Sequence, residues 1–298
     1  MVKKNRLILT ALVVVLFCGI GFLIHGKHAN EYSKEEKEQS TPIAEVAVST
    51  SPVAVISNEV TVSKTPTLEP TNVPTVTTSQ KESETKNSKH IIVIDAGHQA
   101  KADSSQEPIG PGAKETKKKV SSGTQGRFTG VPEYEVNLQV AKKLEKALTK
   151  LNYTVIMVRE TNDVNISNSE RAEIANDNDA DMLIRIHCNG SEDASVNGIL
   201  TICPTKKNKY CKHIYEDSRR LADCLLEGLL DATKANSRGV TETDSMSGIN
   251  WSLVPVVIVE MGYMTNEEED NKLVTSEYQN QLVEGMVKGI QSYLEEKE

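Results

Sequence analysis

The chain has 298 residues and a formal net charge of −8, because 42 Asp and Glu outnumber 34 Lys and Arg. This balance, with no evident basic face, argues against nucleic acid as a partner. None of the five cysteines lies at the C-x-x-C spacing of a zinc or redox site. They are interpreted as free thiols without function, although Cys203 and Cys211 could bridge in an oxidising compartment.

The sequence predicts three segments before the folded region. Residues 1–6 form a cytoplasmic stub that carries Lys3, Lys4 and Arg6. Residues 7–24 are apolar and uncharged, long enough to cross a bilayer as a helix, and the basic residues before them direct the rest of the chain outside. This segment is a transmembrane anchor or a signal segment, and the lack of a small-x-small cleavage site near Ile24 favours the anchor. Residues 25–88 are rich in Thr, Ser and Pro and predict a disordered linker.

The remaining residues, 89–298, predict one folded domain in which strands and helices alternate. Pro132 begins one helix, and Ser167 with Glu170 forms a capping box that begins another. The polar, glycine-rich run 99–131 predicts a long loop, either a lid or substrate-binding edge or a disordered insertion. The alternation specifies an α/β fold, a mostly parallel twisted sheet with helices on both faces. Strands are expected at 91–96, 153–160, 181–189, 198–205 and 254–266, and helices at 132–151, 167–176, 211–235 and 276–296.

Two histidines stand where apolar strands end. His98 follows the first strand and His187 closes the third, and open α/β sheets bind ligands outside the carboxyl ends of their strands. A hydrolytic zinc ion takes three protein ligands and one open position, and two imidazoles with one carboxylate suit it. Glu133, in the first turn of the helix after the long loop, fits as the third ligand. Taken singly, His98 could be a surface histidine and Glu133 an acid that stabilises the helix dipole.

Glu260 ends the apolar run "VPVVIVE". A charge at the end of such a strand is costly unless it has a partner or a chemical role. A general base beside a metal-activated water is one such role. The alternative is a structural carboxylate paired with a buried cation such as Arg185.

Six motifs in this order and spacing resemble the zinc-dependent N-acetylmuramoyl-L-alanine amidases, cell-wall hydrolases of amidase type 3. They are "IVIDAGHQ", "EYEVNLQVAKKL", "VIMVRETND", "SERAEIAN", "IRIHCNG" and "VPVVIVEMGYMTN", and the resemblance covers residues 89–296. It implies His98, Glu133 and His187 as zinc ligands and Glu260 as the catalytic residue. Arg185 and Asn189 are candidates for contacting the substrate or supporting the site. Many relatives have small residues at Arg185 and Cys188 and threonine at Met261, which puts substrate preference in doubt more than activity.

The resemblance implies Zn²⁺-dependent hydrolysis of the amide between N-acetylmuramic acid and L-alanine of the peptidoglycan stem peptide. The expected location is extracytoplasmic, at the cell wall, anchored in the membrane by the N-terminal segment or secreted if that segment is cleaved. Two alternatives stay open: another zinc peptidoglycan hydrolase, such as a carboxypeptidase or deacetylase, and a non-catalytic wall-binding module. The sequence names no protein activator.

Overall fold

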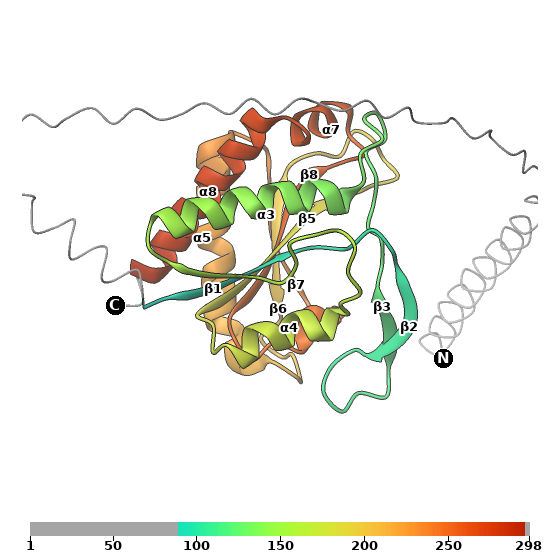
Figure 1. The fold of residues 1–298 in the computed structure, drawn as a ribbon, viewed down its shortest axis with the longest axis vertical. Coiled ribbons are helices and arrows are strands. Elements are labelled where there is room, and N and C mark those ends of the chain that lie inside the picture. Colours follow the sequence, from blue (N-terminus) through green and yellow to red (C-terminus); the bar gives the residue numbers. More distant parts are fainter. Residues whose placement is uncertain (1–88, 296–298) are drawn as a thin grey trace, which may run out of the picture. The chain divides into compact units, whose positions relative to one another are not determined.

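The computed structural model describes residues 89–295 (Figure 1). The predicted cytoplasmic stub, membrane segment and linker lie outside the described residues. Within residues 89–295, no helix combines the length and apolar character needed to cross a membrane.

Six strands form one sheet in the order β4-β1-β5-β8-β6-β7. The first four are parallel, whereas β6 runs antiparallel to β8 and β7 runs parallel to β6. The mostly parallel sheet predicted from the sequence is therefore confirmed. The sequence missed β7, because this edge strand is polar and largely exposed and has no apolar run. The strands are β1 (Ile91–Ala96), β4 (Thr154–Met157), β5 (Met182–Asn189), β6 (Ile199–Pro204), β7 (Ser237–Thr243) and β8 (Val256–Tyr263).

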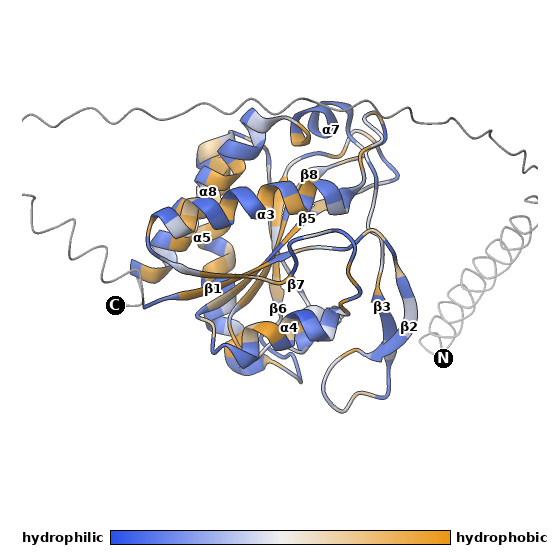
Figure 2. Cartoon of the chain, in the orientation of Figure 1, coloured by the Kyte–Doolittle hydropathy of each residue, from blue (hydrophilic) through white to orange (hydrophobic). Residues whose placement is uncertain are grey.

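Helices cover both faces of this sheet. On one face, α3, α5 and α8 pack in a large apolar cluster with alternate residues of β1, β5 and β8. The opposite face carries a smaller cluster with α4, α6 and a short 3₁₀ helix. Figure 2 shows apolar residues concentrated along the central strands and polar residues on the outer sides of the helices. The helices are α3 (Glu133–Lys150), α4 (Asn168–Asp177), η1 (Lys212–Ile214), α5 (Tyr215–Thr233), α6 (Ser247–Asn250), α7 (Glu267–Leu273) and α8 (Ser276–Glu295).

The alternation of side chains along the central strands gathers four polar residues on the face that α4 covers. In β5, Ile184, Ile186 and Cys188 join the large cluster on the other face. Successive residues of a strand point to opposite faces, so Arg185 and His187 point toward α4. The same alternation in β1 and β8 brings Asp95 and Glu260 to this face.

The run 99–131, predicted as a loop, contains an antiparallel hairpin of β2 (Asp103–Pro108) and β3 (Thr116–Val120). The prediction of a loop without secondary structure was wrong because these strands are polar and lack an apolar alternation. Tertiary contacts hold the hairpin instead. Buried Glu107 accepts hydrogen bonds from the Ser247 hydroxyl (2.7 Å) and from the backbone and hydroxyl of Ser169 (3.1 and 2.8 Å). The hairpin is thus fixed to the first residues of both α4 and α6.

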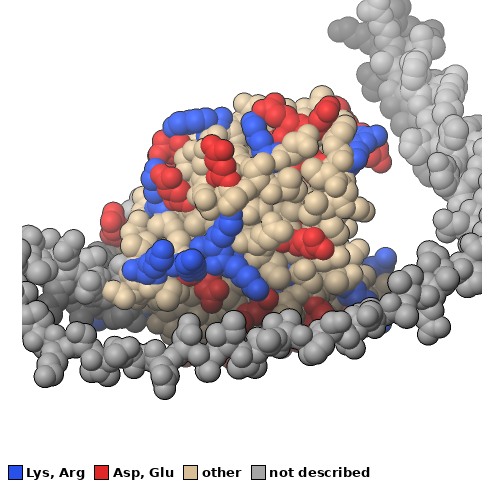
Figure 3. All heavy atoms as spheres, turned by 45° about the horizontal axis from the view of Figure 1, so that its top comes forward, with Lys and Arg blue, Asp and Glu red and all other residues tan. Residues whose placement is uncertain are grey.

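Cys188, Cys203 and Cys211 are buried free thiols, as the sequence favoured, and Cys224 is buried as well. The fifth, Cys18, lies outside the described residues. On the face shown in Figure 3, acidic and basic side chains are interspersed.

Candidate metal centre and active site

Three predicted ligands meet at the carboxyl ends of β1 and β5. The Glu133 Oε1 atom lies 3.3 Å from His98 Nε2 and 3.2 Å from His187 Nδ1, and the two imidazole nitrogens are 3.2 Å apart. Ligand atoms at 2.0–2.1 Å from a tetrahedral zinc ion lie roughly 3.3–3.4 Å apart. The three donors therefore fit one face of a zinc coordination tetrahedron, and the group could hold a metal ion.

His98 occupies a left-handed backbone conformation with φ of +62°, which is uncommon for a residue other than glycine. Its Nδ1 lies 3.0 Å from the Ser121 carbonyl oxygen. Since a carbonyl only accepts, Nδ1 carries the proton and the lone pair of Nε2 faces the other two ligands. The residues after β3 thus set the tautomer of a ligand that follows β1.

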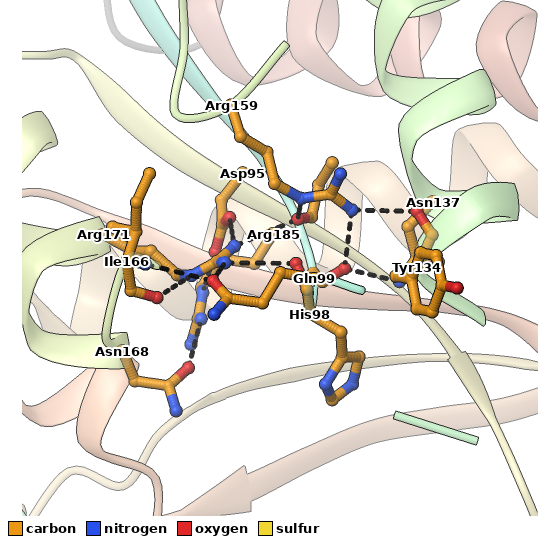
Figure 4. A network of polar contacts seen from close by, with 12 residues as sticks. Asp95, His98, Gln99, Tyr134, Asn137, Arg159, Ile166, Asn168, Arg171 and Arg185 are labelled. Carbon is orange, nitrogen blue, oxygen red and sulfur yellow. Dashed lines mark hydrogen bonds and ion pairs between the residues drawn. The ribbon is translucent and has the colours of Figure 1, made fainter. Parts of the chain in front are cut away.

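Two buried arginines hold the turn that contains His98 (Figure 4). Arg159 donates to the carbonyls of Ala96 (2.7 Å) and Gly97 (3.0 Å). Arg171 donates to the carbonyls of Ala96 (3.1 Å) and His98 (3.1 Å). Each carbonyl of the turn is therefore bound to a guanidinium group, which stabilises the unusual backbone of the ligand.

Glu133 is 2% exposed and hydrogen-bonded at both oxygens. Oε2 accepts from Thr124 N (2.8 Å), and Oε1 accepts from Cys188 N (3.0 Å) and from the Asn137 amide (3.1 Å). Burial, the largest single influence, raises the pKa of Glu133, but the imidazoles of His187 and His98 beside its carboxylate lower it by more. The pKa of Glu133 consequently lies well below its ordinary range, so the carboxylate is ionised, as a metal ligand must be.

His187 is a buried candidate ligand whose ring packs on a glycine. Burial lowers the pKa of His187 to about 4, although the neighbouring Glu133 carboxylate, which accepts from the protonated ring, opposes this shift, so the imidazole is neutral at pH 7. A Cβ atom at Gly97 would lie 2.3 Å from the ring atom Cε1. The "AGH" turn after β1 therefore needs glycine to leave room for the second histidine.

We expect Gly97→Ala to displace the His187 ring and to weaken zinc binding by at least about tenfold, the range found for changes next to metal ligands. Competition with a chromogenic chelator measures this affinity. Gly239→Ala is the matched control, since its Cβ would contact nothing within 4 Å while its φ of +77° imposes backbone strain. It should lower the melting temperature and leave zinc affinity unchanged. Equal zinc affinity in Gly97→Ala and wild type would contradict this packing role.

Glu260 lies directly opposite His187 in the pairing of β8 with β5. Burial and the nearby charge of Glu133 raise its pKa to about 8. Among the described residues, no hydrogen-bond partner of the buried Oε2 atom is found. Arg185, which the structural interpretation of Glu260 paired with it, instead forms an ion pair with Asp95 (2.8 Å). A carboxyl group in this state is typical of an acid–base catalyst.

The candidate site opens into a cavity of about 520 Å³. His98, His187 and Glu260 line it together with residues of the β2–β3 hairpin. Arg185 also lines this cavity, which keeps it a candidate for substrate contact. Asn189, the other such candidate, is the last residue of β5 and is not among the residues that line the cavity. Its amide oxygen accepts a hydrogen bond from Gly190 N (2.8 Å).

Sequence reasoning assigned no role to several residues behind the ligands. Asp95 is fully buried and paired with Arg171 (2.6 Å) as well as Arg185, while Asn137 bridges Glu133 and the Gly97 carbonyl. A signal was present at Asp95, which interrupts the apolar run of β1, because buried charges such as Asp95 and Arg171 need partners. Which partners they choose depends on contacts between residues more than 70 positions apart.

Comparisons with known proteins agree with this geometry. A family model described as N-acetylmuramoyl-L-alanine amidase matches residues 92–292. Among curated proteins, the uncharacterized protein YqiI of Bacillus subtilis is 30% identical over 175 residues, covering 59% of this chain and 80% of that protein. The N-acetylmuramoyl-L-alanine amidase LytC of Bacillus subtilis is 30% identical over 164 residues, covering 55% of this chain and 32% of LytC.

Solved structures show the same fold. The N-acetylmuramoyl-L-alanine amidase from Clostridium difficile 630 is 29% identical with a TM-score of 0.57, covering 70% of this chain and 98% of that one. The apo form of the amidase Ami1 from Mycobacterium abscessus is 26% identical with a TM-score of 0.62, covering 69% and 98%. With the family model matched over most of the folded region, this chain belongs to the N-acetylmuramoyl-L-alanine amidase family.

Proposed function

We propose that residues 89–298 form a zinc-dependent amidase that hydrolyses the bond between N-acetylmuramic acid and L-alanine in peptidoglycan. The observation that carries the proposal is the meeting of His98, Glu133 and His187 within hydrogen-bonding distance of one another, with Glu260 lining the same cavity as the two histidines. Membership of the amidase family supports the choice of substrate.

In this proposal the three ligands hold the ion and Glu260 moves the proton. Bound zinc supplies a Lewis acid for the scissile carbonyl and acidifies its water. Glu260, ionised when the metal site is occupied, would accept a proton from the attacking water and return it to the leaving amine. The fixed tautomer of His98 and the backbone donors to Glu133 keep the ligands in place.

The same proposal places the domain outside the cytoplasm. Its substrate lies there, and residues 7–24 and 25–88 would serve as membrane anchor and tether. The membrane is thus the second partner besides peptidoglycan.

We expect the fragment 89–298, loaded with zinc, to fold and to release intact stem peptides from muropeptides. Product analysis separates the candidate activities: an amidase frees the N-terminal amine of L-alanine, a carboxypeptidase frees a C-terminal amino acid, and a deacetylase frees acetate. A folded, zinc-loaded fragment that releases no stem peptide would refute the proposed function, and binding without turnover would favour the wall-binding module.

A further inference from the structure

Arg185 lies at the floor of the catalytic cavity, two residues before His187 on the same face of β5. Its Nε donates to Asp95 (2.8 Å) and its Nη2 donates to Asn168 (2.8 Å). The third nitrogen, Nη1, lies against α6, where a Cβ atom on Gly248 would come within 1.8 Å of it. The absence of a side chain at Gly248 therefore makes room for the guanidinium group in the cavity wall.

Positive charge exceeds negative charge behind this wall. The Asp95 carboxylate forms ion pairs with both Arg171 and Arg185 (Figure 4). Arg159 lies nearby. Burial is the main cause that lowers the pKa of Arg159 to about 10, and the charge of Arg171 lowers that pKa further. The three arginine residues are each 3% exposed or less. Buried charge is costly unless it is compensated, so the floor of the cavity favours an anionic ligand.

The hairpin adds two lysines to the opposite wall. Lys117 and Lys118 of β3 line the same cavity, and Lys117 reaches across to donate to the Ser245 carbonyl (2.6 Å). Glu107 ties this hairpin to α4 and α6, so the lysines stand at a fixed place beside the floor. Arg185 and the lysines thus form a cationic subsite next to the metal ligands.

We propose that this subsite binds a free carboxylate on the residue that follows L-alanine in the stem peptide. The inference rests on the proposed amidase function. Two residues of a β-strand span about 6.6 Å, the separation of Arg185 from His187 along β5. Two residues of an extended stem peptide span a similar distance of roughly 7 Å. A scissile carbonyl at the metal centre therefore brings the second residue of the stem to Arg185.

In Arg185, Nε and Nη2 are engaged by Asp95 and Asn168, which leaves Nη1 to donate to the ligand, and a hydrogen bond between two charged groups is stronger than one to a neutral amide oxygen. The subsite would therefore discriminate between stems whose second residue has a free carboxylate and stems in which it is amidated. Substrate preference is thereby assigned to Arg185.

The test uses the zinc-loaded full-length chain and three synthetic muramyl tripeptides. The first carries free carboxylates, the second is amidated at the second residue, and the third is amidated only at the third residue. We expect kcat/KM to be about tenfold or more higher for the first and third than for the second, as hydrogen bonds to charged groups allow. Equal rates on all three, or a preference for the second, would overturn the inference. A loss confined to the third would assign the subsite to a different carboxylate and overturn it as stated.

Two variants test whether Arg185 and Lys118 cause the preference for a free carboxylate at the second residue. Arg185→Gln and Lys118→Gln should each lower the ratio of kcat/KM on the free-carboxylate substrate to kcat/KM on the substrate amidated at the second residue, with zinc content as wild type. Lys146→Gln, an exposed lysine on α3 away from the cavity, is the control and should retain the preference. If Arg185→Gln fails to fold because Asp95 loses a partner, two measurements still test the subsite. They are the effect of Lys118→Gln and the wild-type ratio of kcat/KM on the first and second substrates. A preference that survives in both folded variants would refute the subsite, whereas no hydrolysis of any substrate would refute the proposed function itself.

Discussion

Glu260→Gln should retain its zinc and lose activity by a factor of about 10² to 10⁴, the usual contribution of a general acid–base catalyst. Gln keeps the size of the side chain and removes the proton acceptor. The measurements are zinc stoichiometry, melting temperature and kcat on muropeptides, made on the same sample. A stable, zinc-loaded variant that turns over near the wild-type rate would exclude Glu260 from the mechanism.

The stability of the same variant distinguishes catalysis from a structural role. The folded-state pKa of Glu260 is about 8 and its ordinary value is 4.5. Glu260 ionises less readily in the folded state than in the unfolded state. The free energy of unfolding of the wild type therefore falls as the pH rises from 4.5 to about 8. The metal-free Gln variant should therefore melt higher than metal-free wild type at pH 8, by roughly 5 °C or more, and equally at pH 4. A structural ion pair would give the opposite sign at pH 8.

Glu133→Ala should lose both zinc and activity, with an effect larger than the 10- to 100-fold cost of changing a residue behind a metal ligand. The variant removes one of three ligands and leaves the N–H groups of Thr124 and Cys188 without their acceptor. Each such buried donor costs about 1–3 kcal/mol, so the melting temperature should fall as well. Metal analysis after dialysis and calorimetry with and without added zinc provide the measurements.

Glu135→Ala is the matched control, because Glu135 shares the first turn of α3 with Glu133. If acids in this turn serve only the helix dipole, both variants should lose a similar, small stability of about 0.3–1 kcal/mol and keep their zinc. Zinc retention by Glu133→Ala would therefore return Glu133 to a structural role. Loss of zinc in Glu133→Ala alone would identify it as a ligand.

Local pattern sufficed for most of the fold. Apolar runs such as Ile91–Ala96 predicted the buried strands, and the Ser167 capping box fixed where α4 begins. The alternation of strands with helices then implied a mostly parallel sheet, whose carboxyl edge collects strand-end residues such as His98 and His187. The polar strands β2, β3 and β7 were not predicted, because they have no apolar periodicity of their own and are held by contacts with distant parts of the chain.

The sequence by itself thus determined which residues could bind a metal, because strand ends and a helix start are local features. Only the tertiary structure decided the chemical state of each group. The raised pKa of Glu260, the tautomer of His98 and the choice of Asp95 as partner for Arg185 depend on burial and on neighbours far away in the chain. Electrostatic and hydrogen-bond energies depend on distance in space, and sequence separation carries no information about that distance.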